Sequence, residues 1–376
     1  MRGIKLLKIF GIQVSLDLTW FVVFSLVVWS LAAGYFPLHY PGKGGLIYLM
    51  MGIISSLLLF ASVLFHEISH SIVSNKLGTP IKEITLFIFG GVAKLSKEPE
   101  EPMAEFKIAI AGPISSIFLV FVFYILKWIL QIIITAPLIT AILDYLVMIN
   151  IILVVFNLIP GFPLDGGRVL RAILWQKTND VQKATAITSS IGKGFAMLLI
   201  FFGIIQVFAG NFLGGMWSVF IGLFLQQAAE SGYQQALIRN TLAGVNVRDA
   251  MTKDVVTIPD NYTISRVAEE FFFVHHFIGF PVISDGKLVG MLTLNDVRQI
   301  PKSEWDSIFA RDVMDSAVGE TVISPADSVM DAMTKMINLG RGRLPVVEDN
   351  RLVGIITRRD IMKLMEFRID LGMKPA

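Results

Sequence analysis

The chain has 376 residues, of which 54% are hydrophobic and only 16% are charged. Soluble domains carry about 25% charged residues, so this composition argues against a wholly soluble protein. The formal net charge of +2 gives no electrostatic basis for binding nucleic acid. Cysteine is absent, which excludes disulfides, thiol nucleophiles and metal sites with cysteine ligands.

Charge divides the chain into two parts. Residues 1–240 carry 16 basic and 11 acidic residues, whereas 241–376 carry 16 basic and 19 acidic residues in little more than a third of the length. We therefore predict a membrane-embedded domain over 1–240 and a soluble domain over 241–376.

Charge-free runs in the first part predict six transmembrane helices, because a bilayer-spanning helix needs about 20 apolar residues. The last run divides into two helices at a turn marked by Gly210–Asn211 and Gly214–Gly215. The third helix extends past Lys127, a loop is expected at Pro137, and Asp144 is expected at the start of the fourth helix. The runs are Leu18–Gly42, Gly44–Phe65, Ile108–Leu126, Tyr145–Leu164 and Gly194–Ala229.

Lysine and arginine in the short loops predict the orientation. Thirteen basic residues fall on one side of the six spans, and only Lys43, with Lys127 at a helix edge, falls on the other. The basic side of a membrane protein is cytoplasmic, so we expect the N-terminus and residues 241–376 in the cytoplasm and the spans in the cell membrane. The thirteen are Arg2, Lys5, Lys8, Lys76, Lys82, Lys94, Lys97, Lys107, Arg168, Arg171, Lys177, Lys183 and Lys193.

The end of the second span carries an H-E-x-x-H motif, His66-Glu67-Ile68-Ser69-His70. On a helix, His66 and His70 lie one turn apart on the same face and can bind one metal ion. Glu67 can hold and deprotonate a water molecule there. Ionisable residues that continue a membrane helix are costly and usually functional. The alternative is a polar helix end at the membrane interface.

A catalytic zinc site also needs a third protein ligand. His39 is expected on the opposite side of the membrane, and His275 and His276 lie in the soluble part. Asp165 is expected on the same side as the H-E-x-x-H motif, in the segment 157–167, whose prolines and glycines break the helix. Broken backbone at membrane depth is tolerated where it is buried in protein or lines a cavity, so Asp165 should face inward. The alternative is an interfacial turn in which Asp165 caps the next helix.

The soluble part contains an internal repeat. Pro281–Val297 and Pro345–Ile361 are identical at eight of seventeen positions at an offset of 64, and Val247–Met251 echoes Ala310–Met314. Each copy predicts a strand, a turn, a second strand and then a helix. A pair of copies of this length makes one compact domain rather than a long solenoid. A further helix is predicted in each copy, near Ile264–Val274 and near Val329–Leu339.

An H-E-x-x-H motif near the end of a membrane helix, followed about 100 residues later by N-x-x-P-x-x-P-L-D-G-G, resembles the site-2 protease family of intramembrane zinc metalloproteases. The resemblance covers Leu16–Glu230. It implies a six-transmembrane-helix metalloprotease core with a small embedded β-hairpin or sheet, followed here by an α/β domain.

Carried over to this chain, the resemblance assigns one Zn²⁺ to His66, His70 and Asp165. It makes Glu67 the catalytic base and then the proton donor. Asn157 would steady the scissile carbonyl or its oxyanion through its side-chain amide. The substrate would be a membrane protein, cleaved within or near a transmembrane segment.

Two further stretches fit the same family. Ile81–Leu95 is too short to span the membrane and is rich in strand formers, so it resembles the embedded sheet beside the active site. The strand edge around Gly90 and Gly91 could pair with an unwound substrate, although a plain loop hairpin is the alternative. Ala111-Gly112-Pro113 resembles the family's A-G-P-x-x-N with Ser116 in place of Asn, and there we expect only helix packing through small residues.

The repeat resembles a tandem pair of CBS domains, over about 245–303 and 308–366. The resemblance lies in two G-x-x-T-x-x-D motifs, and it implies that their Thr and Asp side chains contact the ribose and phosphates of ATP, ADP or AMP. The alternative is that each Thr is only a helix N-cap. CBS pairs often dimerise, which makes a homodimer a further expectation. The four residues are Thr293, Asp296, Thr357 and Asp360.

The sequence therefore predicts an intramembrane zinc metalloendopeptidase regulated by adenine nucleotide at its CBS pair. One alternative is a CBS-regulated ion transporter or channel, because polar residues in broken helices can bind ions. Another is a catalytically silent membrane scaffold. Glu67 discriminates between these classes, since neither transport nor scaffolding requires a base beside the two histidines.

Overall fold

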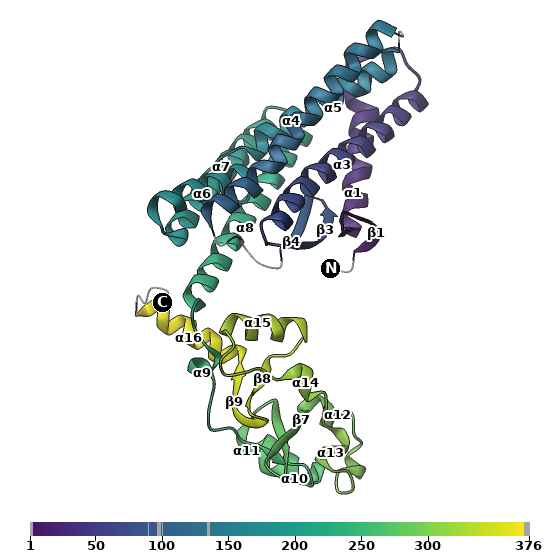
Figure 1. Cartoon of the computed structure of the whole chain (residues 1–376). Helices are drawn as coiled ribbons and strands as arrows, with labels where there is room; N and C mark the ends of the chain where they lie inside the picture. The colour runs from purple at the N-terminus through teal and green to yellow at the C-terminus, as the bar shows by residue number, and fades with distance from the viewer. Residues whose placement is uncertain (1–2, 89, 96–98, 100, 134–135, 372–376) are drawn as a thin grey trace. The chain divides into compact units, whose positions relative to one another are not determined.

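The structure, a computed structural model, describes residues 3–88, 90–95, 99, 101–133 and 136–371 (Figure 1). For residues 90, 92–95, 213, 239–240, 318 and 320 it describes the backbone alone. The chain divides into two compact units, Met1–Gln234 and Gln235–Ala376.

Helices dominate the first unit. Among the described residues, five helices are long and apolar enough to cross a membrane: Leu18–His39, which combines α1, η1 and α2, and then α3, α4, α5 and α7. The sixth predicted span falls on α8, part of whose side chains lie outside the description. The helices are α1 (Leu18–Ser30), η1 (Leu31–Tyr35), α2 (Phe36–His39), α3 (Gly45–Lys76), α4 (Pro102–Ile133), α5 (Pro137–Asn157), α6 (Asp165–Thr178), α7 (Val181–Phe208) and α8 (Phe212–Leu242).

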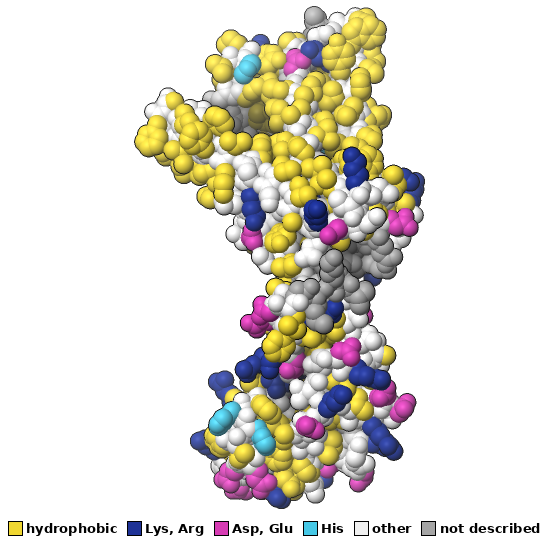
Figure 2. All heavy atoms as spheres, turned by 90° about the vertical axis from the view of Figure 1, so that its left-hand side faces the viewer, with side chains coloured by type: hydrophobic (Ala, Val, Ile, Leu, Met, Phe, Trp, Pro, Cys, Tyr) yellow, Lys and Arg dark blue, Asp and Glu magenta, His cyan; other side chains and the backbone are white. Residues whose placement is uncertain are grey.

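The outer surface of these helices is apolar. Phe121, Trp128, Phe201 and Phe208 are each more than half exposed. On the face that Figure 2 draws, hydrophobic side chains cover most of the first unit. Such a surface needs an apolar solvent, so the first unit is a membrane-embedded domain.

Two predicted features of α5 differ from the structure. Pro137 is the first residue of the helix rather than part of a loop, and Asp144 therefore lies two turns inside the helix. Proline is well tolerated at the first helical position, because its missing N–H would have no helical partner there. Asp144 is stabilised by an ion pair with Lys127 of α4 and by the hydroxyl of Tyr40, which donates to it at 3.1 Å. Counting charge-free runs therefore placed the helix start too late.

A four-stranded sheet lies beside the helices, in the order β1-β2-β3-β4. Its strands are β1 (Ile4–Ile9), β2 (Ile12–Leu16), β3 (Ile81–Phe87) and β4 (Gly90–Leu95). The hairpin predicted over 81–95 is confirmed as β3–β4, whereas β1 and β2 were not predicted. Strands β2 and β3 pair in parallel, and the other two pairs are antiparallel. The buried face of the sheet packs on α1 and α3 through a core that includes Ile12, Trp20, Ile68 and Ile84.

The segment between α5 and α6 is held in close backbone contact with α7. A Cβ added to Gly166 would lie 2.3 Å from the carbonyl oxygen of Leu158, and one added to Gly192 of α7 would lie 1.9 Å from that of Phe162. The N–H of Phe162 donates to the carbonyl of Thr188 on α7 at 3.1 Å. Glycine at these positions permits the close approach of the backbones. These backbone contacts fix where α6 begins.

The second unit contains two similar halves. The predicted strand–turn–strand–helix pattern is confirmed in both, as β6, β7 and α12 in the first and β8, β9 and α16 in the second. The elements are α9 (Val247–Ala250), β5 (Ile258–Pro259), α10 (Ile264–Val267), η2 (Ala268–Phe272), α11 (Phe273–His275), β6 (Gly279–Ser284), β7 (Lys287–Thr293), α12 (Leu294–Arg298), η3 (Lys302–Glu304), α13 (Ala310–Val313), α14 (Val318–Thr321), α15 (Val329–Asn338), β8 (Arg343–Glu348), β9 (Arg351–Thr357) and α16 (Arg358–Asp370).

The two halves exchange their opening segments. Val247, in the opening segment of the first half, is buried in the core of the second with Leu344 and Ile356. Ala310, in the opening segment of the second half, is buried in the core of the first with Phe280 and Leu292. Each core therefore needs both copies of the repeat, which explains why the pair forms one compact unit.

Candidate metal centre

Helices α3 and α6 bring three metal-ligating side chains together. The Nε2 atoms of His66 and His70 lie 3.0 Å and 3.2 Å from Oδ2 of Asp165, the first residue of α6, and 3.1 Å from each other. Both histidines are buried. Within the described part of the chain, this is the one group of three residues able to hold a metal ion.

The other imidazole nitrogens are engaged from α4. His66 Nδ1 lies 2.9 Å from the hydroxyl of Ser116, and His70 Nδ1 lies 2.7 Å from the carbonyl oxygen of Ile108. A carbonyl only accepts hydrogen bonds, so His70 Nδ1 must carry the proton and donate it. A neutral His70 then presents a lone pair at Nε2, toward the carboxylate of Asp165. Partners of this kind fix the tautomer of metal-binding histidines.

The donor set fits one zinc ion. Lone pairs of His70 Nε2 and of the Asp165 carboxylate converge, and this arrangement is repulsive unless a cation or an added proton lies between them. Ligand atoms that share a tetrahedral zinc at about 2.0–2.1 Å lie about 3.3 Å apart, close to the separations observed. Two imidazoles and a carboxylate also leave a fourth position for water or substrate, as in catalytic zinc sites.

Gly112 of α4 lies directly against the two histidines. An added Cβ would stand 2.2 Å from His70 Nε2 and 2.5 Å from His66 Nε2. Sequence reasoning expected Gly112 and Ser116 to serve helix packing only, and missed these contacts. Their spacing of four residues on one face of α4 was the available signal, because it places both toward the same neighbour.

Glu67 lies beside the sheet. It is half-buried, and within the described part of the chain no residue hydrogen-bonds to its carboxylate. An added Cβ at Gly91 of β4 would lie 2.4 Å from Glu67 Cγ and 3.2 Å from its Oε1. The strand that carries Gly90 and Gly91 therefore passes next to the predicted base. β4 is an edge strand of the sheet.

Asn157 is the last residue of α5 and is half-buried. It stands at the start of the bent segment whose end carries Asp165. No described residue hydrogen-bonds to its side-chain amide.

The four predicted nucleotide-binding residues form two capping boxes. Asp296 Oδ2 accepts from the hydroxyl of Thr293 at 2.6 Å and from its N–H at 2.8 Å. Asp360 Oδ2 accepts from the same groups of Thr357 at 2.7 Å and 2.9 Å. Each pair starts a helix, α12 or α16, as the N-cap alternative requires.

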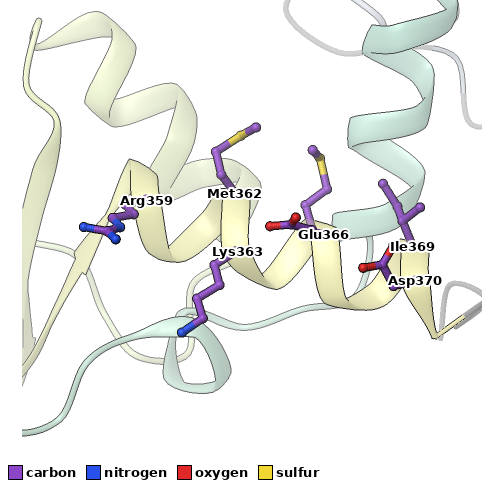
Figure 3. Close-up of a pocket in the computed structure, with 7 residues that line it drawn as sticks. Arg359, Met362, Lys363, Glu366, Ile369 and Asp370 are labelled. Atoms are coloured by element: carbon purple, nitrogen blue, oxygen red, sulfur yellow. The ribbon is translucent and has the colours of Figure 1, made fainter.

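A separate hollow of about 540 Å³ lies along α16 (Figure 3). None of the four predicted nucleotide-binding residues is among the described residues that line it. These are Arg359, Met362, Lys363, Met365, Glu366, Ile369 and Asp370.

Comparison with known proteins assigns both units. The Peptidase family M50 model matches residues 54–138 and 129–201, and the CBS domain model matches 247–302 and 310–366. The zinc metalloprotease MJ0392 of Methanocaldococcus jannaschii is 32% identical, over 96% of this chain and 96% of its own. Rip3 of Mycobacterium tuberculosis, also named for zinc metalloprotease activity, is 32% identical over 97% of this chain and 93% of its own. A solved structure of the site-2 protease from M. jannaschii is 32% identical and covers 62% of this chain and 95% of that one, with a TM-score of 0.42.

A membrane-embedded unit, a family match and near full-length relatives together define a membrane metalloprotease. The chain belongs to peptidase family M50, the site-2 protease family, and carries a C-terminal pair of CBS domains.

Proposed function

We propose that this protein hydrolyses a peptide bond within or near a transmembrane segment of a membrane-protein substrate. In this proposal His66, His70 and Asp165 hold one zinc ion and Glu67 is the base. The observation that carries it is the convergence of three ligand atoms within 4.8 Å. The next residue after His66 is Glu67, and no described residue hydrogen-bonds to its carboxylate.

Glu67 and Asn157 have different roles in the proposed hydrolysis. Zinc, when bound, acts as a Lewis acid on the substrate carbonyl and makes water acidic enough to lose a proton near neutral pH. Glu67 takes that proton at its carboxylate and later gives it to the leaving amine. The amide of Asn157 donates a hydrogen bond to the oxygen on which negative charge develops.

The substrate pairs with the edge of β4. A peptide bond inside a helix is shielded by helical hydrogen bonding, so the substrate must unwind locally before hydrolysis. An extended segment that adds to a sheet edge regains main-chain hydrogen bonds. Gly90 and Gly91 lie on that edge, and the contact between Gly91 and Glu67 supports this position for the substrate.

The test is cleavage of a transmembrane-helix substrate by the purified full-length protein, for the wild type beside Glu67→Gln. We expect cleavage by the wild type, and none by the variant, because the amide cannot accept a proton from water. Equal cleavage by both proteins would contradict the assignment of the base. Ion flux through the protein in vesicles, without proteolysis, would favour the transporter alternative.

The CBS pair binds an adenine nucleotide through Thr293, Asp296, Thr357 and Asp360 in this proposal, and nucleotide binding regulates cleavage. The place of these residues at the N-termini of α12 and α16 supports it, because the helix N–H groups that a capping box leaves unbonded favour an anion. Calorimetric titration of the full-length protein with ATP, ADP and AMP tests it, with Thr293→Ala/Thr357→Ala as the comparison. No heat with any of the three nucleotides would contradict nucleotide binding.

In this proposal the helices span the cell membrane, and the N-terminus and the CBS pair lie in the cytoplasm. The basic residues at the helix ends near the candidate site support this orientation. The tendency of CBS pairs to dimerise supports a homodimer. Protease protection of oriented vesicles tests the orientation. The mass of the detergent-solubilised protein tests the dimer.

A further inference from the structure

The sheet of the first unit has one apolar and one polar face. On the apolar face, Leu16 of β2 lies beside Leu86 of β3, and both are buried against α1 and α3. On the polar face, Gln13 lies beside Glu83. The two faces alternate along each strand, as the pleat requires.

Strand β1 extends the polar face with lysines. In the register with β2, Lys5 lies beside Ser15 and Lys8 beside Gln13. Together with Lys82 of β3 they surround a hollow of about 530 Å³. Its lining consists of Lys5, Lys8, Gly11, Gln13, Lys82 and Glu83.

The lysine hollow keeps a net positive charge, since its described lining holds three lysines and one carboxylate, that of Glu83. None of the three lysines makes an ion pair with a described residue, whereas Glu83 already accepts a hydrogen bond from Ser15 at 2.9 Å. The side-chain amide of Gln13 donates to the carbonyls of Leu7 and Val14. Three ammonium groups around one hollow attract an anion.

The same hairpin exposes large apolar side chains. Ile4, Leu6 and Leu7 are 48%, 51% and 48% exposed, and Phe10 at the turn is 77% exposed. The membrane-spanning segment begins at Leu18, two residues after β2 ends. The hairpin therefore lies at the end of a spanning helix, where lipid headgroups meet acyl chains. Figure 1 shows β1 at the end of α1, beside the N-terminus.

We infer that the β1–β2 hairpin is a binding site for anionic phospholipid. The ammonium groups of Lys5, Lys8 and Lys82 contact the headgroup phosphates, and the exposed apolar side chains contact the acyl region. A soluble anion would satisfy the lysines but would leave Phe10 and its apolar neighbours in water. A phospholipid satisfies both groups, which is how amphipathic segments bind at a membrane surface.

The test is thermal unfolding of the full-length protein in nanodiscs of phosphatidylcholine, with and without phosphatidylglycerol. A ligand that binds the native state raises the unfolding midpoint. We expect phosphatidylglycerol to raise the midpoint of the wild type, and at least half of this rise to be lost in Lys5→Gln/Lys8→Gln/Lys82→Gln.

The matched control is Lys107→Gln/Lys177→Gln/Lys183→Gln, which removes three exposed positive charges from the same unit but outside the hollow. It should keep the full rise. Equal loss in both triple variants would overturn the site, since it would indicate a general charge effect. The same rise on adding inorganic phosphate to phosphatidylcholine nanodiscs would overturn lipid as the ligand.

A second measurement leaves the three lysines unchanged and follows the fluorescence of a label at position 10. The chain has no cysteine, so Phe10→Cys accepts one environment-sensitive fluorophore without competing sites. We expect its emission to shift to the blue in phosphatidylglycerol nanodiscs and to be quenched by brominated acyl chains. Leu38→Cys, 79% exposed in α2, should not respond to headgroup charge. A Phe10 label that stays in water in both lipids would overturn the inference, whether or not the protein cleaves a substrate.

Discussion

Gly112 sets how closely α4 approaches the two histidines of the candidate metal centre. Any Cβ at this position would overlap both Nε2 atoms that face Asp165. In Gly112→Ala we expect zinc binding and cleavage to be lost while the spans still insert, because the added methyl group displaces the imidazoles. The comparison is Gly194→Ala in α7, where an added Cβ meets nothing within 4 Å. Metal analysis of both purified variants checks this, and zinc retained in Gly112→Ala would contradict it.

Ser116 orients His66 from the side opposite Asp165. Loss of such a hydrogen-bond partner costs about 10–100-fold in metal affinity, so Ser116→Ala should release zinc to a competing chelator more readily than the wild type. Ser115→Ala is the matched control, because the one bond of the Ser115 hydroxyl among the described residues is donated to the carbonyl of Gly112 in its own helix. Equal chelator sensitivity in the two variants would show that the contact with His66 does not act on the metal.

The candidate ligands were predictable from the sequence, but their supporting residues were not. His66, His70 and Asp165 follow from motif spacing, since helical periodicity and a helix break determine their faces. The roles of Gly112 and Ser116 depend on how α4 crosses α3. That crossing is set by packing between distant segments, which no local pattern encodes.

At the scale of elements, α4 and α6 are joined by a buried ion pair. Glu105 of α4 is 1% exposed and accepts from Nε of Arg171 on α6 at 2.7 Å, with a further bond from the same guanidinium. Arg168 lies 3.9 Å from the same carboxylate. Because Asp165 begins α6, this pair fixes the helix that supplies the third candidate ligand.

Removing one member of the pair should be worse than removing both. Glu105→Gln leaves Arg171 buried without its counter-charge, a change that costs about 3–5 kcal/mol in folding free energy. The double variant Glu105→Gln/Arg171→Met should recover part of that loss. Thermal unfolding of the two single variants and the double variant measures the coupling, with exposed Glu101→Gln as the control. Additive losses would contradict a direct interaction.

Hydropathy predicted the long helices well and the N-terminal strands poorly. Lys5 and Lys8 were interpreted as a basic flank of the first span, although Ile12, Val14 and Leu16 alternate with polar residues as a half-buried strand does. β2 pairs with its sequence neighbour β1 and also with β3, which is more than 60 residues away. Sequence proximity could therefore not indicate the β2–β3 pairing, which joins the four strands into one sheet.

At the scale of the whole molecule, the exchange of opening segments couples the two CBS copies. Leu344→Ala removes side-chain volume from the core that also buries Val247, and core Leu→Ala changes cost about 2–5 kcal/mol. We expect amide hydrogen exchange to accelerate in both hairpins, β6–β7 and β8–β9. Leu294→Ala, at a position 42% exposed, should change neither hairpin. Faster exchange in β8–β9 alone would contradict the coupling.

The repeat itself was predictable from eight identical positions, but the exchange was not. Because the two copies carry similar opening motifs, the sequence does not indicate which of the two cores buries each opening segment.

We propose that His66, His70 and Asp165 bind the zinc of this metalloprotease while Glu67 does not. The most direct measurement is zinc per chain in the purified wild type, Glu67→Gln, His70→Ala and Asp165→Ala. We expect one zinc, within error, in the wild type and in Glu67→Gln, since a single three-ligand site binds one ion, and strongly reduced zinc in the other two variants. Full zinc in Asp165→Ala, or loss of zinc in Glu67→Gln, would contradict it.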